Sequence, residues 1–156
     1  MITIKIPHLN ILNLNNLVLD YNGTLAVDGE IIESVINILK SLSFNLNIYI
    51  ITADTYGFVE EQIKDIPCKL IILPPGNQDK AKLRFIEQLN AKETVCIGNG
   101  KNDRLMLKES SLGIVVIGRE GAALDSLIAA DVVCNSITDA LDILLQTKRL
   151  VATLRL

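Results

Sequence analysis

The stretch that decides the fold runs from an apolar segment into a tight turn and reads Leu17-Val18-Leu19-Asp20-Tyr21-Asn22-Gly23-Thr24. Three apolar residues in a row are typical of a buried strand. The pair Asn22-Gly23 favours a tight turn, in which the Thr24 hydroxyl lies beside open backbone N–H groups. Asp20 therefore lies at the end of a buried strand, where it is a candidate nucleophile.

Strand-like and helical segments alternate on the C-terminal side of this stretch. Expected strands cover 17–20, 47–52, 69–73, 94–97, 113–117 and 131–133, and expected helices cover 31–42, 56–64, 79–89, 102–109, 120–129 and 137–145. Strands that are apolar on both faces and alternate with helices indicate a mostly parallel sheet between two helical layers. The sequence predicts an α/β protein with a three-layer α/β/α, Rossmann-like fold.

The two ends of the chain have patterns of their own. Segments 2–6 and 9–14 alternate in a way that predicts an N-terminal β-hairpin at the edge of the sheet. The tail, 146–156, alternates like a strand yet also fits a continued helix, and we expect a strand that covers the hairpin or meets another subunit. The expected organisation is a single domain over 1–156, with a hairpin (1–16), a core (17–145) and a tail.

Composition excludes several classes of protein. With 156 residues, of which 49% are hydrophobic, the chain can bury one full core. The net charge is -3 and the basic residues are dispersed, so nucleic acid is not an expected partner. There is no apolar run of roughly 18 residues and no signal-peptide pattern, so we expect a cytoplasmic protein without a membrane partner. The cysteine spacings predict free thiols, at Cys68, Cys96 and Cys134.

Polar residues follow several of the expected strands. Thr52 and Ala53 end the second strand, the fourth is followed by Gly98-Asn99-Gly100-Lys101-Asn102-Asp103, and the helix after the third begins with Asp79-Lys80-Ala81-Lys82. Ligands of doubly wound sheets gather at the carboxyl ends of the strands. We expect these residues to line one crevice together with Asp20.

The residues in this crevice suit phosphoryl transfer to a carboxylate. Asp20 supplies the nucleophile. Mg²⁺ prefers oxygen ligands, which Asp20, Asp103 and the backbone carbonyl of Asn22 provide. Thr52 is expected to hold a phosphate oxygen and a lysine to offset charge. Of Lys80 and Lys82, spacing back from Gly98 favours Lys80 and leaves the other as a solvated helix residue. The expected substrate-binding residues are Gly23, Thr24, Thr52, Ala53, Lys80 and Asn102.

The motifs resemble those of the haloacid dehalogenase superfamily. Asp20-Tyr-Asn-Gly-Thr24 is similar to its first motif, Asp-x-Asp-Gly-Thr, and Gly98-Asn-Gly-Lys-Asn-Asp103 to its fourth, Gly-Asp-Gly-x-Asn-Asp, while Thr52 and Lys80 fall where the second and third belong. The likeness covers about 17–145 and is greatest to the phosphorylation domain of P-type ATPases and small soluble proteins related to it. It implies a Mg²⁺-dependent phosphatase that forms an aspartyl-phosphate on Asp20.

Two amides stand where the superfamily has aspartates. Asn22 replaces the residue that protonates the leaving group, and Asn99 replaces an aspartate near the metal, which leaves Asp20 and Asp103 as the main anionic ligands. Loss of a general acid typically costs about 10²- to 10⁴-fold in rate. The resemblance therefore implies a slow phosphatase. The alternative is a catalytically degraded module that binds a phosphate compound, a metal or a protein.

The spacing of the motifs leaves no room for a cap domain. Between Thr24 and Thr52 there is length for a small flap and one helix, and between Thr52 and Lys80 for one helix and one strand. A capless site is open to solvent unless a second subunit covers it. We expect a small phosphorylated substrate and a homo-oligomer, a dimer or a tetramer.

Overall fold

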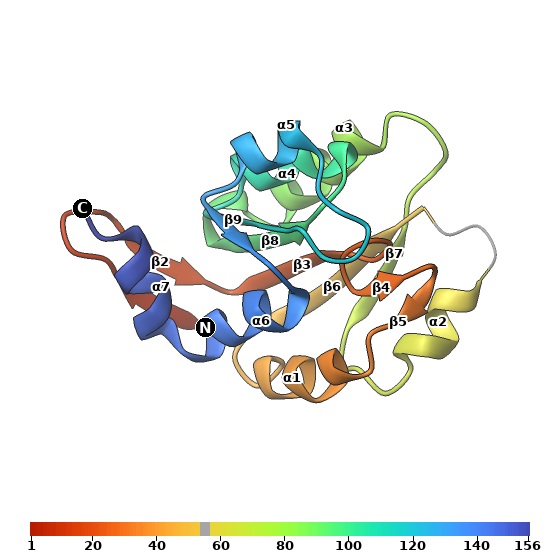
Figure 1. The fold of residues 1–156 in the computed structure, drawn as a ribbon, viewed down its shortest axis with the longest axis horizontal. Coiled ribbons are helices and arrows are strands. Elements are labelled where there is room, and N and C mark those ends of the chain that lie inside the picture. Colours follow the sequence, from red (N-terminus) through yellow and green to blue (C-terminus); the bar gives the residue numbers. More distant parts are fainter. Residues whose placement is uncertain (54–56) are drawn as a thin grey trace.

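A six-stranded parallel sheet forms the centre of the molecule. The computed structural model describes residues 1–53 and 57–156, shown in Figure 1. The strand order is β10-β9-β8-β3-β6-β7, with β3 (Asn16–Asp20), β6 (Asn47–Thr52), β7 (Lys69–Ile72), β8 (Thr94–Gly98), β9 (Leu112–Val116) and β10 (Val132–Cys134). The chain moves from β3 outward to β7 and then returns to β8 on the other side of β3. This reversal places the ends of β3 and β8 beside each other, which is where such sheets bind ligands.

Helices cover both faces of the sheet. In Figure 1, α3 (Gln78–Gln88), α4 (Arg104–Glu109) and α5 (Leu124–Ala129) lie above it, and α1 (Ser34–Leu42), α2 (Phe58–Ile63) and α6 (Ile137–Leu145) lie below. Residues of β3 alternate between the two cores, because Leu17 and Leu19 pack in the one below and Val18 in the one above. The predicted three-layer fold is confirmed.

The predicted N-terminal hairpin is present, as β1 (Ile2–Lys5) and β2 (Ile11–Leu14). It forms a two-stranded sheet of its own and does not join the edge of the parallel sheet, where the sequence had placed it.

The prediction of a strand in the C-terminal tail is wrong, because this segment forms α7 (Thr147–Leu154). Leu150 is buried in the lower core, and Val151 and Leu154 pack against the same core, so the apolar side chains share one face at helical spacing. Figure 1 shows α7 beside the hairpin. A helix covers the apolar face of a hairpin whose two strands already pair with each other.

A small flap follows the β3 turn. It consists of β4 (Ala26–Val27) and β5 (Glu30–Ile31), joined by Asp28 and Gly29, both of which have positive φ angles. The chain between β3 and β6 holds this flap and α1, and the described part between β6 and β7 holds α2. Within 1–53 and 57–156 no cap domain is inserted at either place, as the motif spacing predicts.

The helices are short, and α3 has 11 residues. Among the helices of the described chain, none combines the length and the hydropathy that a bilayer crossing requires. Two 3₁₀ turns, Ala91–Glu93 and Lys101–Asp103, lead into β8 and α4 respectively.

Candidate active site

Two aspartates and one lysine meet at the carboxyl ends of β3 and β8. Lys82 Nζ lies 2.5 Å from Asp20 Oδ1 and 2.6 Å from Asp103 Oδ1. All three side chains are buried, and Asp103 is 0% exposed. A buried carboxylate is costly unless it is paired, and Lys82 is the cation that both of these side chains contact.

Lys82, and not Lys80, is the lysine that α3 brings to the site. The prediction that Lys80 faces Asp20 is corrected, because Lys80 is exposed. Residues 80 and 82 point about 200° apart around a helix axis, so only one of them can face the sheet. Ile86 is one turn beyond Lys82 and fully buried, and the two form the inward face of α3.

The turn after β8 holds Asp103 through its backbone. The N–H groups of Asn99 and Gly100 each donate to Asp103 Oδ2 over 2.9 Å. Gly98 allows this close approach, since a Cβ there would lie 2.5 Å from Asp103 Cγ. Asp103 is therefore fixed in position before any ligand binds.

Thr24 and Asn99 join the turn after β3 to the turn after β8. The Thr24 hydroxyl lies 3.1 Å from Asp20 Oδ2 and 3.2 Å from Asn99 Oδ1, so its proton is shared between two acceptors. Asn99 Nδ2 donates to the carbonyl of Gly121 over 3.0 Å. Gly23 lies against the Asn99 amide so closely that a Cβ would be 2.3 Å from Nδ2. The Asn99 side chain thus links three loops around Asp20.

Burial and neighbouring charges shift the pKa values of both Asp20 and Lys82. Burial, and next the charge of Asp103, raise the pKa of Asp20 to about 7, although Lys82 acts in the opposite direction. The pKa of Lys82 is raised, because the attraction of both aspartates outweighs the cost of its burial. Lys82 is therefore a cation at neutral pH, and burial favours the protonated form of Asp20.

The other predicted site residues lie at varied distances from this group. Thr52 is buried at the end of β6, which is paired with β3, and Ala53 is half-buried after it. Asn22 is exposed and lines a pocket beside the turn. Asn102 Nδ2 donates to Gln78 Oε1 over 2.9 Å, so this side chain ties the β8 turn to the start of α3.

The oxygen donors of the site fit a magnesium ion. Among the described residues, no group of three or more His, Cys, Asp or Glu side chains could hold a metal. Mg²⁺, however, is usually held by one or two carboxylates together with waters and substrate phosphate. Asp20 and Asp103 supply two carboxylates, which the shared contact with Lys82 holds side by side. The Asn99 amide, in contrast, is already used by Thr24 and Gly121.

Sequence reasoning missed Lys82 and the groups that support the β8 turn. One sequence feature could have identified Lys82: Ile86 is an apolar residue four positions later, and this spacing places both on the buried face of the helix. Ser126 of α5 is fully buried and donates to the Gly100 carbonyl over 2.6 Å. No motif marks Ser126 or Gly121, since both reach the site from loops and helices far along the chain.

Two solved structures with a similar fold are phosphatases. A crystal structure of 3-deoxy-D-manno-octulosonate 8-phosphate phosphatase from Moraxella catarrhalis, in complex with magnesium, phosphate and KDO, matches with a TM-score of 0.73 and 15% identity. The match covers 91% of this chain and 94% of that chain. The cobalt-bound deoxy-D-mannose-octulosonate 8-phosphate phosphatase from Haemophilus influenzae matches with a TM-score of 0.73 and 18% identity, over 88% and 90% of the two chains. The chain thus has a haloacid dehalogenase-like fold, and its described residues include no cap.

At the level of sequence, an uncharacterized protein of Methanocaldococcus jannaschii is 46% identical over 84 residues, which are 51% of this chain and 90% of the archaeal one. The chain belongs to the same protein family as this archaeal protein. No model of a known protein family matches the sequence.

Proposed function

We propose that the protein is a Mg²⁺-dependent phosphatase that acts on a small phosphorylated molecule and uses Asp20 as its nucleophile. One observation carries the proposal: the Asp20 carboxylate is held at a buried strand end by Lys82 on one oxygen and Thr24 on the other. This arrangement fixes a carboxylate for in-line attack and places a cation beside it. The phosphatases that share the fold support the same reaction class.

The reaction has two steps. An oxygen of Asp20 attacks the phosphorus atom, the bond from phosphorus to the ester oxygen breaks, and an aspartyl-phosphate forms while the alcohol leaves. Water then attacks the phosphorus atom, the bond to Asp20 breaks, and inorganic phosphate and the free carboxylate result. Asp20, Asp103 and the Asn22 carbonyl would hold Mg²⁺, which would supply charge stabilisation to the phosphate.

Lys82 and Asp103 act on the charge of the nucleophile. The Lys82 ammonium stabilises the ionised form of Asp20 and the negative charge of the phosphoryl group beside it. Asp103 in turn keeps Lys82 charged and oriented. We propose that Lys82 performs the task that the motif spacing had given to Lys80.

Asn22 sets the expected rate. The amide of Asn22 cannot give a proton to the departing alcohol or take one from the attacking water, so both proton transfers involve solvent. The loss of a general acid and base at this position lowers the rate by about 10²- to 10⁴-fold. We therefore expect slow turnover and an aspartyl-phosphate that persists long enough to be detected.

A second candidate function is supported by the bonding of Asn99. Because Asn99 links Thr24 to Gly121, the loops stay closed around Asp20 without a carboxylate at this position. A module that binds a phosphate compound or a protein without catalysing a reaction requires no more than this closed arrangement of loops. Asn22→Asp, alone and combined with Asn99→Asp, separates the candidates. A gain in turnover in either variant marks a detuned enzyme, and no gain in the folded Asn22→Asp protein marks a binding module.

A single-turnover assay tests the phosphatase. The protein is mixed with acetyl phosphate or p-nitrophenyl phosphate at high magnesium, quenched in acid and analysed by mass spectrometry for a phosphoryl group on Asp20. We expect the adduct in the wild type and in Lys80→Met, and none in Asp20→Asn. Neither adduct nor Asp20-dependent product in the wild type rejects the proposal.

The proposal also includes a cellular compartment and an oligomeric state. We propose a cytoplasmic homo-oligomer, a dimer or a tetramer, in which a second subunit covers the open site. The three cysteines are free, which suits a reducing compartment. Light scattering coupled to size-exclusion chromatography measures the oligomeric state, and a monomer at all concentrations contradicts this part.

A further inference from the structure

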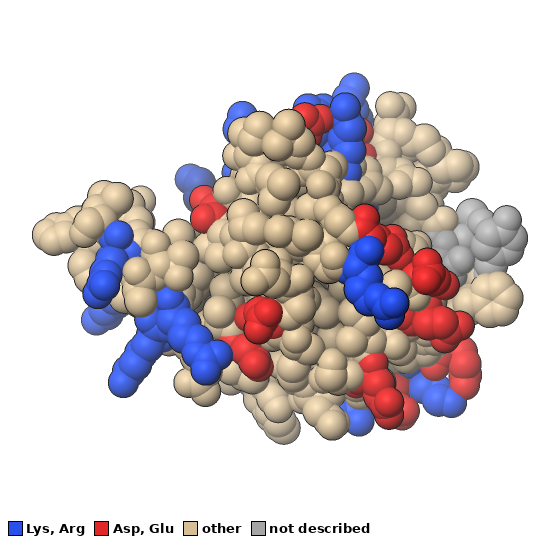
Figure 2. All heavy atoms as spheres, in the orientation of Figure 1, with Lys and Arg blue, Asp and Glu red and all other residues tan. Residues whose placement is uncertain are grey.

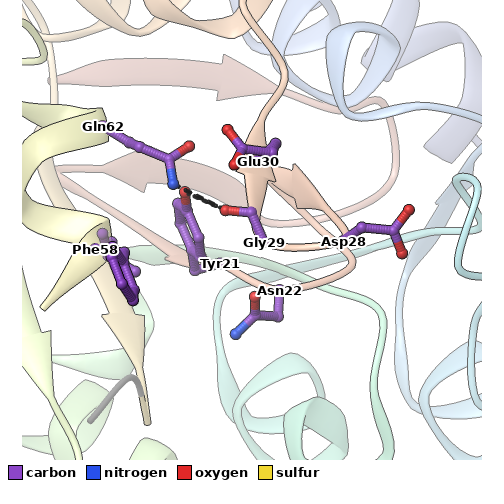
Figure 3. A pocket seen from close by; sticks show the side chains of 8 residues that line it. Tyr21, Asn22, Asp28, Gly29, Glu30, Phe58 and Gln62 are labelled. Carbon is purple, nitrogen blue, oxygen red and sulfur yellow. Dashed lines mark hydrogen bonds between the residues drawn. The ribbon is translucent and has the colours of Figure 1, made fainter. Parts of the chain in front are cut away.

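A pocket of about 420 Å³ opens beside the turn that carries the proposed nucleophile. Asn22 forms part of its wall, the flap contributes Asp28 and Glu30, and α2 contributes Phe58 and Gln62. In Figure 3 Tyr21 stands between Phe58 and the flap, Asn22 lies below Gly29, and the Asp28 carboxylate points away from Phe58. Asn22 is two residues from Asp20 along the chain, so this pocket and the proposed nucleophile share one turn.

The walls of the pocket are held together by hydrogen bonds. Gln62 Nε2 donates to the carbonyl of Gly29 over 2.9 Å, and its Oε1 accepts from the N–H of Ile31 over 2.7 Å. Tyr21 Oη donates to the same Gly29 carbonyl over 3.3 Å, as drawn in Figure 3. The flap is thereby fixed to α2, so the pocket exists before a ligand arrives.

The charge of the pocket is negative. Asp28 and Glu30 are exposed, and the described lining contains no lysine or arginine. Arg119 lines the neighbouring cleft, which shares Asp28 and Glu30 with this pocket. Figure 2 shows several acidic side chains over the flap and α2 on the right of the view, with basic side chains among them. A second anionic group on the substrate would be repelled here, and a cation would be attracted.

Two neutral groups suit a small polar cation. The Phe58 side chain is 70% exposed, so its ring is open to a ligand, and aromatic faces attract ammonium groups. In the part of the chain that the structure describes, the Asn22 amide has no hydrogen-bond partner, and its oxygen is open to an N–H or O–H donor.

We propose that the substrate is a phosphate monoester whose alcohol part carries an amine, and that this pocket binds the ammonium group. The inference rests on the proposed function, and it separates this chain from the phosphatases that share its fold. Their substrate, an octulosonate phosphate, carries a carboxylate by its name, and that is the charge this pocket disfavours.

Three substrates of nearly equal size test the charge preference: 2-aminoethyl phosphate, 2-hydroxyethyl phosphate and phosphoglycolate. At low ionic strength we expect kcat/KM to decrease in that order, by about tenfold from the amine to the carboxylate. Added salt should reduce this ratio, because Asp28 and Glu30 are exposed. Equal kcat/KM values, or a preference for the neutral or the acidic ester, overturn the inference.

A matched pair of variants isolates the pocket. In Asp28→Asn/Glu30→Gln the ratio of amine to carboxylate should fall to about one. Glu60→Gln/Glu87→Gln alters the net charge by the same amount at exposed positions outside this lining and should keep the wild-type ratio. A fall of the ratio in both variants assigns the preference to net charge and overturns the pocket.

These experiments distinguish a failure of this inference from a failure of the proposed phosphatase activity. Asp20-dependent turnover of p-nitrophenyl phosphate without a charge preference leaves the phosphatase intact and overturns only the inference. If no ester is hydrolysed, the three phosphates are titrated into labelled protein and the amide resonances of Gly29 and Gln62 are followed. Tighter binding of 2-aminoethyl phosphate then supports the pocket, and equal or reversed affinities overturn it.

Discussion

Lys82 Nζ lies 2.5 Å from Asp20 Oδ1, in an ion pair from which solvent is almost fully excluded. A second aspartate, Asp103, is 2.6 Å from the same nitrogen. One lysine thus serves two buried carboxylates that would otherwise repel each other. The pair joins α3 to β3, so the chemistry of the site and the stability of the fold depend on the same contact.

Removal of the Lys82 ammonium should strongly destabilise the folded protein. Lys82→Met leaves Asp20 and Asp103 buried without a cation, and breaking a buried ion pair in this way typically costs about 3 to 5 kcal/mol. We expect a large loss in the free energy of unfolding, measured by urea denaturation, and loss of the phosphoenzyme. Lys80→Met is the matched control, and at its exposed position a change within about 0.5 kcal/mol is expected. Equal effects of the two substitutions would contradict the assignment of Lys82.

Asn99 should tolerate aspartate poorly. In Asn99→Asp the donor to the Gly121 carbonyl is lost, and an acceptor faces an acceptor. A buried group left unsatisfied costs about 1 to 3 kcal/mol. Thermal or urea unfolding measures this, with Asn22→Asp as the control at an exposed position. A variant as stable as the wild type would show that the link from Asn99 to Gly121 does not matter.

Asn22 should be the position at which activity can be gained. Asn22→Asp places a carboxyl group two residues after the nucleophile, where it can donate a proton to the leaving alcohol. We expect kcat/KM for an alkyl ester such as 2-hydroxyethyl phosphate to increase, up to the roughly 10²- to 10⁴-fold of a general acid, and to increase much less for p-nitrophenyl phosphate, whose leaving group needs little protonation. The double variant Asp20→Asn/Asn22→Asp should remain inactive. An unchanged rate in the single variant would favour the binding module.

The pKa of Asp20 predicts how stability depends on pH. Its pKa is 3.8 in an unfolded chain and about 7 in the folded protein, so between these values the folded state retains a proton that the unfolded state has lost. The free energy of unfolding of the metal-free protein should therefore fall as pH rises from 3.8 to about 7. Denaturation at several pH values in a chelator measures the slope. Asp20→Asn should lack this contribution, and the same slope in that variant would contradict it.

Much of the fold could be predicted because its signals are local. The apolar run at Leu17–Leu19 and the later alternation indicated a parallel sheet, and the structure places the strands within a residue or two of the expected ranges. The structure of the tail was harder to predict. Leu150 and Leu154 are four positions apart, and this spacing puts them on one face of a strand as well as on one face of a helix. Packing against the apolar face of the hairpin decides for a helix, and that face belongs to residues more than a hundred positions away.

The sequence by itself determined which carboxylates meet, since Asp20 and Asp103 follow strands whose ends a parallel sheet brings to one edge. Tertiary structure alone decided the rest of the site. The rotation of α3 about its axis is fixed by Ile86 in the upper core, and that rotation buries Lys82 and exposes Lys80. Likewise, the partners of Asn99 are a hydroxyl from the β3 turn and a carbonyl from the loop before α5. A strand end is set by neighbours in the chain, whereas the partner of a side chain is set by packing between segments that are distant in the sequence.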